Sequence, residues 1–354
     1  MKKTSKIMSL VLAGAMVLFM TACAGNTAET TSAAAKSQET EADTASKAEE
    51  TTGAEASESE TAAKAEGTTY KIGVLQLVQH TALDAANDGF IAALDDAGIA
   101  YEVDQQNASG DQSACQTVAS KFANEKKDLI LAIATPAAQA MVGAVEDTPV
   151  LITAVTDPAE SGLVDTNEKP GANVTGTSDL TPVKEQIDLL KQLVPEAKTV
   201  GVLYCSAESN SKIQADMAKE AIAAAGMESK EYTVSSSNEI QTVVQSMVGA
   251  VDAVYAPTDN VIAAGMATVG MVAGDNNLPV ICGEAGMVQN GGLATYGIDY
   301  YQLGYMTGQQ AVKILTEGAS PADMPIEYLP AEKCELTVNE ETAQTLGIDV
   351  SGLK

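Results

Sequence analysis

The residues best suited to chemistry in this chain are polar side chains that directly follow short apolar runs. They are His80, Thr135, Thr156, Asp157, Asn210, Ser211, Thr258, Asp259, Glu284 and Asp299. Threonine hydroxyls and the N–H groups at helix starts can hold an anion, and carboxylates on the other side can hold an ammonium group. This combination fits the zwitterion of an α-amino acid. The chain contains no arginine, which excludes the bidentate guanidinium clamp for a ligand carboxylate.

The same residue types also begin helices as plain N-caps, so each candidate is open to a purely structural role. This structural interpretation is strongest for Thr135 and Asp259. His80 is the single histidine of the chain and follows the first apolar run. It can contact a ligand or remain a solvated loop residue, and the sequence leaves both interpretations open.

Catalytic motifs are missing from the sequence. It has no GxSxG, no HExxH and no GxxxxGK[ST]. One histidine limits general-base chemistry, although paired carboxylates such as Asp157 and Asp259 keep glycoside hydrolysis open as an alternative. The sequence therefore predicts a binding protein and not an enzyme, with neither cofactor nor metal.

The elements that must position these residues alternate between strand and helix. Strands are predicted at residues 71–77, 101–105, 128–134 and 149–155, and again at 199–204, 228–234, 252–256, 279–282 and 293–296. Helices are predicted at 83–97, 112–125, 136–145, 182–193, 209–225, 238–248, 260–270 and 300–317. This pattern indicates two doubly wound α/β lobes with parallel sheets, joined by crossing strands. Ligands of such sheets bind beyond the carboxyl ends of the strands, so we expect a site in the cleft between the lobes and closure about a hinge.

Net charge and cysteine spacing exclude some classes of binding partner and metal site. The net charge of -28 makes nucleic acid and anionic lipid implausible partners. Four cysteines beyond residue 23 are widely spaced, which argues against a zinc site. They are interpreted as small buried residues, with a disulfide between Cys205 and Cys282 as the alternative.

The N-terminal residues predict export. Lys2, Lys3 and Lys6 precede an apolar run over residues 7–20, and Cys23 follows two small residues. This resembles a bacterial lipobox, in which the cysteine is diacylated and becomes the mature N-terminus, so residues 1–22 are predicted to be a signal peptide. Residues 24–67 are rich in Ala, Thr, Ser and Glu, which predicts a disordered acidic tether. The expected location is the outer face of the bacterial cell membrane.

Several segments together resemble the substrate-binding lipoproteins of ABC importers, and specifically their tryptophan/tyrosine branch with the type I periplasmic-binding-protein fold. The matching segments are residues 70–84 (YKIGVLQLVQHTALD), 128–139 (DLILAIATPAAQ), 153–158 (TAVTDP), 173–178 (NVTGTS), 254–262 (VYAPTDNVI) and 297–303 (GIDYYQL). The resemblance implies three hinge crossings, with residues 68–178 and 297–322 in lobe 1 and residues 179–296 and 323–354 in lobe 2. It also implies delivery of a captured solute to a permease and its ATPase by a monomeric protein.

Carried over residue by residue, the resemblance assigns ligand contacts to His80, Thr135, Thr156, Asn210, Ser211, Thr258, Asp259 and Glu284. It makes a hydrophobic, and in particular an aromatic, amino acid the leading ligand. The alternatives are a sugar or nucleoside binder of the same fold, an extracellular hydrolase, and a ligand-sensing partner of a membrane receptor. The absence of tryptophan and the few phenylalanines disfavour a sugar, whose ring usually stacks on aromatic side chains.

Overall fold

The computed structural model describes residues 67–353. The predicted signal peptide and Cys23 lie outside these residues, as does the tether up to residue 66. Among the described helices, none is long and apolar enough to cross a membrane. The described residues belong to one compact unit that contains two six-stranded sheets.

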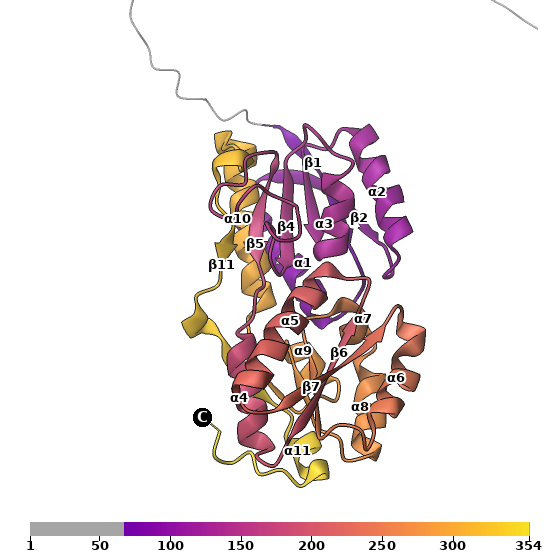
Figure 1. Ribbon diagram of the computed structural model, residues 1–354. Helices are drawn as coiled ribbons and strands as arrows, with labels where there is room; N and C mark the ends of the chain where they lie inside the picture. Colours follow the sequence, from indigo (N-terminus) through magenta and orange to yellow (C-terminus); the bar gives the residue numbers. More distant parts are fainter. Residues whose placement is uncertain (1–66, 354) are drawn as a thin grey trace, which may run out of the picture. The chain divides into compact units, whose positions relative to one another are not determined.

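The first sheet has the strand order β11-β5-β4-β3-β1-β2 and is parallel throughout. Its strands are β1 (Thr69–Gln76), β2 (Ala100–Asn107), β3 (Leu129–Ile133), β4 (Val150–Val155), β5 (Val174–Ser178) and β11 (Glu327–Tyr328). The helices beside it are α1 (Thr81–Asp96), α2 (Gln112–Glu125), α3 (Thr135–Val142) and α10 (Tyr300–Glu317). Helix α10 comes late in the chain but lies against β4, β5 and α1, as its orange ribbon shows in Figure 1.

The second sheet has the order β12-β10-β9-β8-β6-β7, in which only β12 runs antiparallel to its neighbour. Its strands are β6 (Thr199–Cys205), β7 (Glu228–Val234), β8 (Ala253–Ala256), β9 (Val280–Cys282), β10 (Ala294–Gly297) and β12 (Glu335–Val338). Its helices are α4 (Val183–Leu193), α5 (Ser209–Ala224), α6 (Ile240–Met247), α7 (Asn260–Ala264), α8 (Met266–Asp275), α9 (Ala285–Gln289) and α11 (Glu340–Leu346). The predicted architecture of two α/β lobes is confirmed.

The strands in the middle of each sheet are buried on both faces. Every residue of β3 and β8 has a relative exposure of 0 %. Such continuous burial explains why these segments are uniformly apolar instead of alternating, because helices cover both faces of a parallel sheet. The sequence therefore places the polar side chains at the strand ends, where the coverage stops.

Within the described residues the chain passes three times between the sheets: after β5, after β10 and after β11. The last crossing differs in position from the prediction. Strand β11 pairs with β5 of the first sheet, so the chain leaves that lobe after Tyr328, whereas the predicted boundary was residue 322. One predicted helix is also divided, because α7 ends at Ala264 and α8 begins at Met266 after the single residue Gly265.

Two helices of the first lobe approach each other unusually closely. A Cβ atom added at Gly304 of α10 would lie 1.8 Å from the backbone oxygen of Ala86 in α1. A Cβ atom at Gly89 of α1 would lie 1.9 Å from the backbone oxygen of Tyr301. Glycine at these positions therefore allows α1 and α10 to pack backbone against backbone, which fixes α10 to the first lobe.

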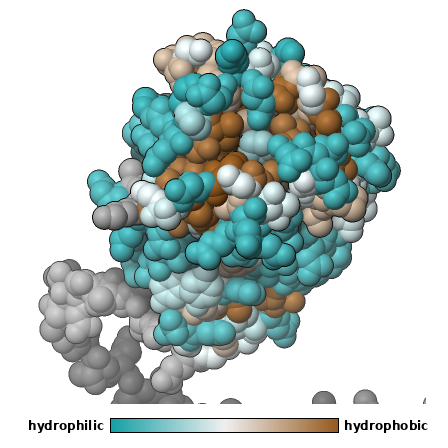
Figure 2. Space-filling view, turned by 90° about the horizontal axis from the view of Figure 1, so that it is seen from below, coloured by the Kyte–Doolittle hydropathy of each residue, from teal (hydrophilic) through white to brown (hydrophobic). Residues whose placement is uncertain are grey.

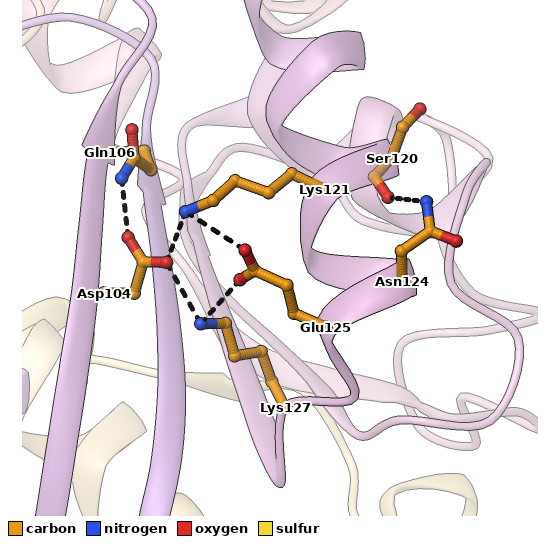
Figure 3. Close-up of polar contacts among 7 residues, drawn as sticks. All are labelled: Asp104, Gln106, Ser120, Lys121, Asn124, Glu125 and Lys127. Carbon is orange, nitrogen blue, oxygen red and sulfur yellow. Dashed lines mark hydrogen bonds and ion pairs between the residues drawn. The ribbon is translucent and has the colours of Figure 1, made fainter. Parts of the chain in front are cut away.

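Figure 3 shows a charged cluster of the first lobe. The Nζ atom of Lys127 lies 3.0 Å from carboxylate oxygens of both Asp104 and Glu125, and Lys121 also pairs with Asp104. The two ammonium groups lie 5.2 and 5.0 Å from the centre of the Phe122 ring. The cluster thus joins β2 to the end of α2 by charge pairing and cation–π contact.

The face seen in Figure 2 is mostly hydrophilic, with apolar side chains gathered in a few areas between polar ones. Large apolar side chains that are exposed among the described residues are Leu180, Met217, Met271, Tyr301 and Tyr328. Single exposed apolar residues are ordinary on protein surfaces.

Candidate ligand-binding cleft

A small cavity lies at the carboxyl ends of the strands and is lined by both lobes. Its lining residues are His80, Leu83, Ala154, Asp179, Thr258, Asp259, Asn260, Ala263, Glu284 and Tyr300. The space between these side chains is about 10 Å³, roughly the room that one water needs. An amino acid can therefore occupy this site only if the lobes separate first or the lining side chains move.

One end of the cavity is acidic. Asp179 follows β5 and is 4 % exposed, and its Oδ2 accepts a hydrogen bond from the Tyr300 hydroxyl at 2.8 Å. Its Oδ1 is buried and has no hydrogen-bond partner within residues 67–353. Burial raises the pKa of Asp179 to about 6. No ion pair to Asp179 is formed within the described residues, so this carboxylate would be stabilised by a cation from outside the chain.

Glu284 adds a second carboxylate at this end. It caps the N-terminus of α9 and accepts hydrogen bonds from the backbone N–H groups of Gly286 and Met287. Burial raises the pKa of Glu284 to about 7; the two backbone donors act against this rise and the charge of Asp179 adds to it. Neither buried carboxyl group forms an ion pair within residues 67–353, which makes this end suitable for an ammonium group.

The cavity lining also includes an imidazole. His80 is the N-cap residue of α1, and its Nε2 lies 3.2 Å from Oδ1 of Asn260, across the gap between the lobes. Asn260 in turn donates from Nδ2 to the buried carboxylate of Glu208 at 2.6 Å. Nδ1 of His80 is buried and without a partner among the described residues. Burial keeps the pKa of His80 below its ordinary value, so the ring is neutral near pH 7.

Two threonine hydroxyls, of which that of Thr258 belongs to the cavity lining, connect the lobes through Gln214. Gln214 of α5 donates from Nε2 to Oγ1 of Thr156, which follows β4 of the first sheet, at 2.9 Å. The same amide hydrogen-bonds the hydroxyl of Thr258, and its Oε1 accepts from the Thr258 backbone N–H at 3.4 Å. All three side chains are buried. Gln214 therefore couples the two lobes in the arrangement described here.

The backbone is strained at two strand ends beside the cavity. Ala134, after β3, has a φ of 83°, and Ala154, in β4, has a φ of 54°. These are conformations that residues with a side chain adopt rarely, and such strain concentrates at ligand sites. Ala134 is the N-cap of α3, a role that was predicted for Thr135. The hydroxyl of Thr135 is instead buried without a partner in the described residues, as is Oδ1 of Asn210.

Some predicted site residues are engaged in local structure. Asp259 lines the cavity, but its oxygens accept from the backbone N–H groups of Ile262 at 2.8 Å and Cys205 at 2.5 Å. Ser211 is fully buried, and its hydroxyl accepts a hydrogen bond from Nδ2 of Asn210 at 3.3 Å. Asp157 accepts from the backbone of Glu160 and from the side chain of Asn167 in its own loop, and it does not line the cavity.

Asp299 is exposed and caps α10 through the Gln302 N–H, outside the cavity lining. Asp157 therefore does not join Asp259 in a paired-acid arrangement around this cavity. Within residues 67–353 no group of three His, Cys, Asp or Glu side chains could hold a metal ion.

The cysteines of the described residues are all free thiols. Cys115, Cys205 and Cys282 are buried, and burial raises the pKa of Cys205 to about 12. The alternative of a disulfide between Cys205 and Cys282 is therefore not found in this structure.

The sequence prediction omitted three residues with central positions. Asp179 follows a crossing strand and lies in a segment, Ser178-Asp179-Leu180, that reads as an ordinary turn. Gln214 lies in the second turn of α5 and Tyr300 begins α10. A search of strand ends that included the crossing strand β5 would have found Asp179.

These features, two α/β lobes and a cavity lined by polar groups from both, define a two-lobed solute-binding protein. The chain belongs to the ABC transporter substrate-binding protein family, whose profile matches residues 71–352. It is 41 % identical over 351 residues to the "Tyrosine-binding protein" of Clostridioides difficile strain R20291, covering 98 % of this chain and 93 % of that protein.

Solved structures give the same assignment. An ABC domain from Streptococcus pneumonia in complex with L-Trp has 39 % identity and a TM-score of 0.78, covering 80 % of this chain and 97 % of that one. The ligand-free, open structure of a substrate-binding protein with adhesive properties from Clostridium difficile has 46 % identity but a TM-score of only 0.62, covering 81 % and 97 %. The present chain thus superimposes better on the ligand complex than on the open form, although its sequence is more similar to the latter.

Family membership confirms the resemblance found in the sequence. The protein is the substrate-binding component of an ABC transporter, a non-catalytic role, and proteins of this family act outside the cytoplasm. A solute-binding protein from Bacillus halodurans with bound myo-inositol, at 16 % identity and a TM-score of 0.59, shares the fold alone.

Proposed function

We propose that this protein captures a free aromatic amino acid, with tyrosine and tryptophan as the leading ligands, and delivers it to an ABC permease and its ATPase. The observation that carries the proposal is Asp179, a buried carboxylate in the cleft with one free oxygen and no cationic partner within the described residues. The names of the relatives, one a tyrosine-binding protein and one a complex with L-Trp, support the choice of ligand.

The chemistry of the cavity suits each part of such a ligand. The ammonium group would lie at the acidic end, near Asp179 and Glu284. The carboxylate would be held by neutral donors, since the chain has no arginine. Among the predicted residues we retain Thr135, Thr156, Thr258 and Asn210 for that role, because they are buried at strand ends or helix starts.

The aromatic ring would lie against the apolar part of the lining. Leu83, Ala154 and Ala263 supply this part, and all three are buried. The small side chains of the two alanines leave space for a ring once the lobes have separated. The present cavity measures only about 10 Å³, and we propose that ligand binding proceeds from an open state through hinge closure.

We further propose that the mature protein is a monomer anchored to the outer face of the cell membrane through a diacylated Cys23. The basic and apolar residues before Cys23 support this proposal. Metabolic labelling with palmitate tests it directly. The wild-type protein should carry the label and sediment with membranes, whereas Cys23→Ser should do neither; a labelled C23S variant would contradict the proposal.

The ligand proposal is tested by a thermal-shift screen of the twenty amino acids on residues 24–354, followed by calorimetry. A ligand that binds only the folded state raises the unfolding temperature. Tyrosine and tryptophan should give the largest shifts, and sugars and nucleosides should give none. A shift with myo-inositol or a pyranose, and none with any amino acid, would overturn the proposal.

A further inference from the structure

We propose that His80 selects ligands whose ring carries a hydrogen-bond donor, a phenolic hydroxyl or an indole N–H, and that Asn260 and Glu208 fix the imidazole tautomer this requires. The inference rests on the proposed function and deepens it. It makes His80 a specificity-determining residue, and it makes Asn260 and Glu208 positioning residues. It predicts that tyrosine and tryptophan bind more tightly than phenylalanine.

The first step concerns the orientation of the Asn260 amide. The Glu208 carboxylate accepts hydrogen bonds from two backbone N–H groups, those of Asn260 at 3.3 Å and Val261 at 3.2 Å. Burial and the charge of Asp259 raise the pKa of Glu208, but Oε2, the oxygen that faces the Asn260 side chain, also accepts from Nδ2 of Asn210 at 3.2 Å and so acts as an acceptor. The Asn260 side-chain atom that lies 2.6 Å from this carboxylate must therefore be the NH₂ group, a donor. Glu208 consequently turns Oδ1 of Asn260 toward the first lobe.

The second step concerns the histidine. Oδ1 of Asn260 lies 3.2 Å from Nε2 of His80 and is an acceptor only, so Nε2 carries the proton. Burial keeps His80 neutral, while its bond to Asn260 and the nearby charge of Asp84 act in the opposite direction. A neutral ring protonated on Nε2 has a lone pair on Nδ1. This Nδ1 is buried and has no partner among residues 67–353, and His80 is one of the residues that line the cavity.

The third step concerns which ligand atom can reach it. His80 follows β1 of the first sheet, and Asp179 follows β5 of the same sheet. In the first sheet, β1 and β5 are separated by two strands, β3 and β4, which places their ends roughly 14 Å apart at the usual strand spacing. An ammonium group at Asp179 thus directs the rest of the ligand toward His80.

The apolar lining lies on the same side as the imidazole. Leu83 is three residues after His80 in α1, and Ala263 is three residues after Asn260 in α7, so each lies about one helical turn beyond its polar neighbour. A ring packed against these side chains presents its edge to Nδ1. A phenol or an indole can donate a hydrogen bond there, but a phenyl ring leaves the buried acceptor unpaired.

Calorimetry with tyrosine, tryptophan and phenylalanine on residues 24–354 measures the selection. The wild-type protein should bind phenylalanine at least ~10-fold more weakly than tyrosine, because an unpaired buried acceptor is costly. His80→Gln retains a polar group near the Nε2 position but loses the Nδ1 acceptor, so the preference should fall below about twofold. His80→Asn retains an acceptor near the Nδ1 position and should keep most of the preference.

A second measurement reads the tautomer without relying on affinity. His80 is the only histidine, so ¹⁵N-histidine labelling of protein purified without a histidine tag gives the signals of one imidazole. The spectrum should show the Nε2–H tautomer before ligand is added, and tyrosine should shift the Nδ1 signal. Asn260→Leu should lose the single-tautomer pattern while the protein remains folded.

The outcomes separate this inference from the proposed function. If none of the three amino acids binds, both fail. If tyrosine and phenylalanine bind equally to the wild-type protein, only the selection by His80 fails. An Nδ1–H tautomer in the ligand-free spectrum, or a Nδ1 signal that tyrosine leaves unchanged, would also overturn the inference.

Discussion

Replacing Asp179 by asparagine should weaken ligand binding and at the same time stabilise the ligand-free protein. The substitution keeps the size of the side chain and an oxygen that can accept from Tyr300, so only the charge is removed. A hydrogen bond to a charged group contributes about 1.5–3 kcal/mol. At about 1.4 kcal/mol per factor of ten, D179N should weaken binding of tyrosine or tryptophan about 10- to 100-fold.

The effect on stability has the opposite sign. Burial raises the pKa of Asp179 from 3.8 to about 6, so the folded state holds this proton more tightly than the unfolded state does. Ionising the buried Asp179 therefore lowers the free energy of unfolding. This loss of stability is absent below pH 3.8, grows as the pH rises, and is complete above about pH 6. A rise of this size corresponds to about 3 kcal/mol at pH 7, which is an order-of-magnitude value. D179N removes this loss of stability.

Calorimetry at pH 7.5 measures the affinity, and urea unfolding of the ligand-free protein at pH 7.5 and pH 4 measures the stability. D179N should be more stable than the wild-type protein at pH 7.5, and the difference should shrink markedly at pH 4. Asp157→Asn is the matched control, because it makes the same chemical change outside the cavity; it should change the affinity by less than about twofold. A D179N variant that binds as tightly as the wild-type protein, or that is less stable at pH 7.5, would show that this carboxylate does not hold the ammonium group.

Three other predictions concern closure, packing and charge. Gln214→Leu should favour the open form and weaken ligand binding several-fold, because a buried hydrogen bond between the lobes contributes about 1 kcal/mol; small-angle scattering without ligand should show a more extended particle, and an unchanged profile would count against a coupling role. Gly304→Ala should destabilise the protein by about 1–3 kcal/mol in urea unfolding, because the added Cβ meets a backbone oxygen, whereas Gly274→Ala, which meets no atom within 4 Å, should be neutral or slightly stabilising. Partial burial raises the pKa of Asp104, but hydrogen bonds to two lysines and a glutamine lower it more, so the charged form stabilises the fold above pH 3.8 and this stabilisation is lost as the pH falls. Asp104→Asn should lower the free energy of unfolding by roughly 1 kcal/mol at pH 7 and by less at pH 3. A loss of stability that does not vary with pH would contradict the charge pairing.

The fold was predictable because its signals are periodic. The central strands are continuous apolar runs and the helices repeat every three to four residues, so most predicted segments lie within a few residues of the observed ones. Strands β5, β11 and β12 were not among the predicted strands; β11 and β12 were missed because two to four residues at a sheet edge carry no clear period. The division between α7 and α8 was missed because its only sequence signal is one glycine, Gly265, and many helices tolerate a single glycine.

The site was only partly predictable, for a physical reason. The strand-end rule brought His80, Thr258 and Glu284 to the cavity lining, but it gave the same weight to Asp157 and Asp299, which lie outside it. A carboxylate that caps a helix and one that faces a ligand follow strands in the same way, and the difference depends on which N–H groups lie nearby. Only the three-dimensional structure shows that the Asp259 oxygens accept from backbone N–H groups while one Asp179 oxygen is free.

The buried thiols have a practical consequence. The thiolate is the nucleophile that attacks alkylating reagents. Burial raises the pKa of Cys115 to about 11 and that of Cys205 to about 12, and it raises the pKa of Cys282 far above its ordinary value. Folded protein beginning at residue 24, with the half-buried Cys334 replaced by serine, should therefore react poorly with maleimide dyes. A single cysteine introduced on each lobe would then accept a dye selectively, and energy transfer between the two dyes would follow lobe movement in real time, one molecule after another.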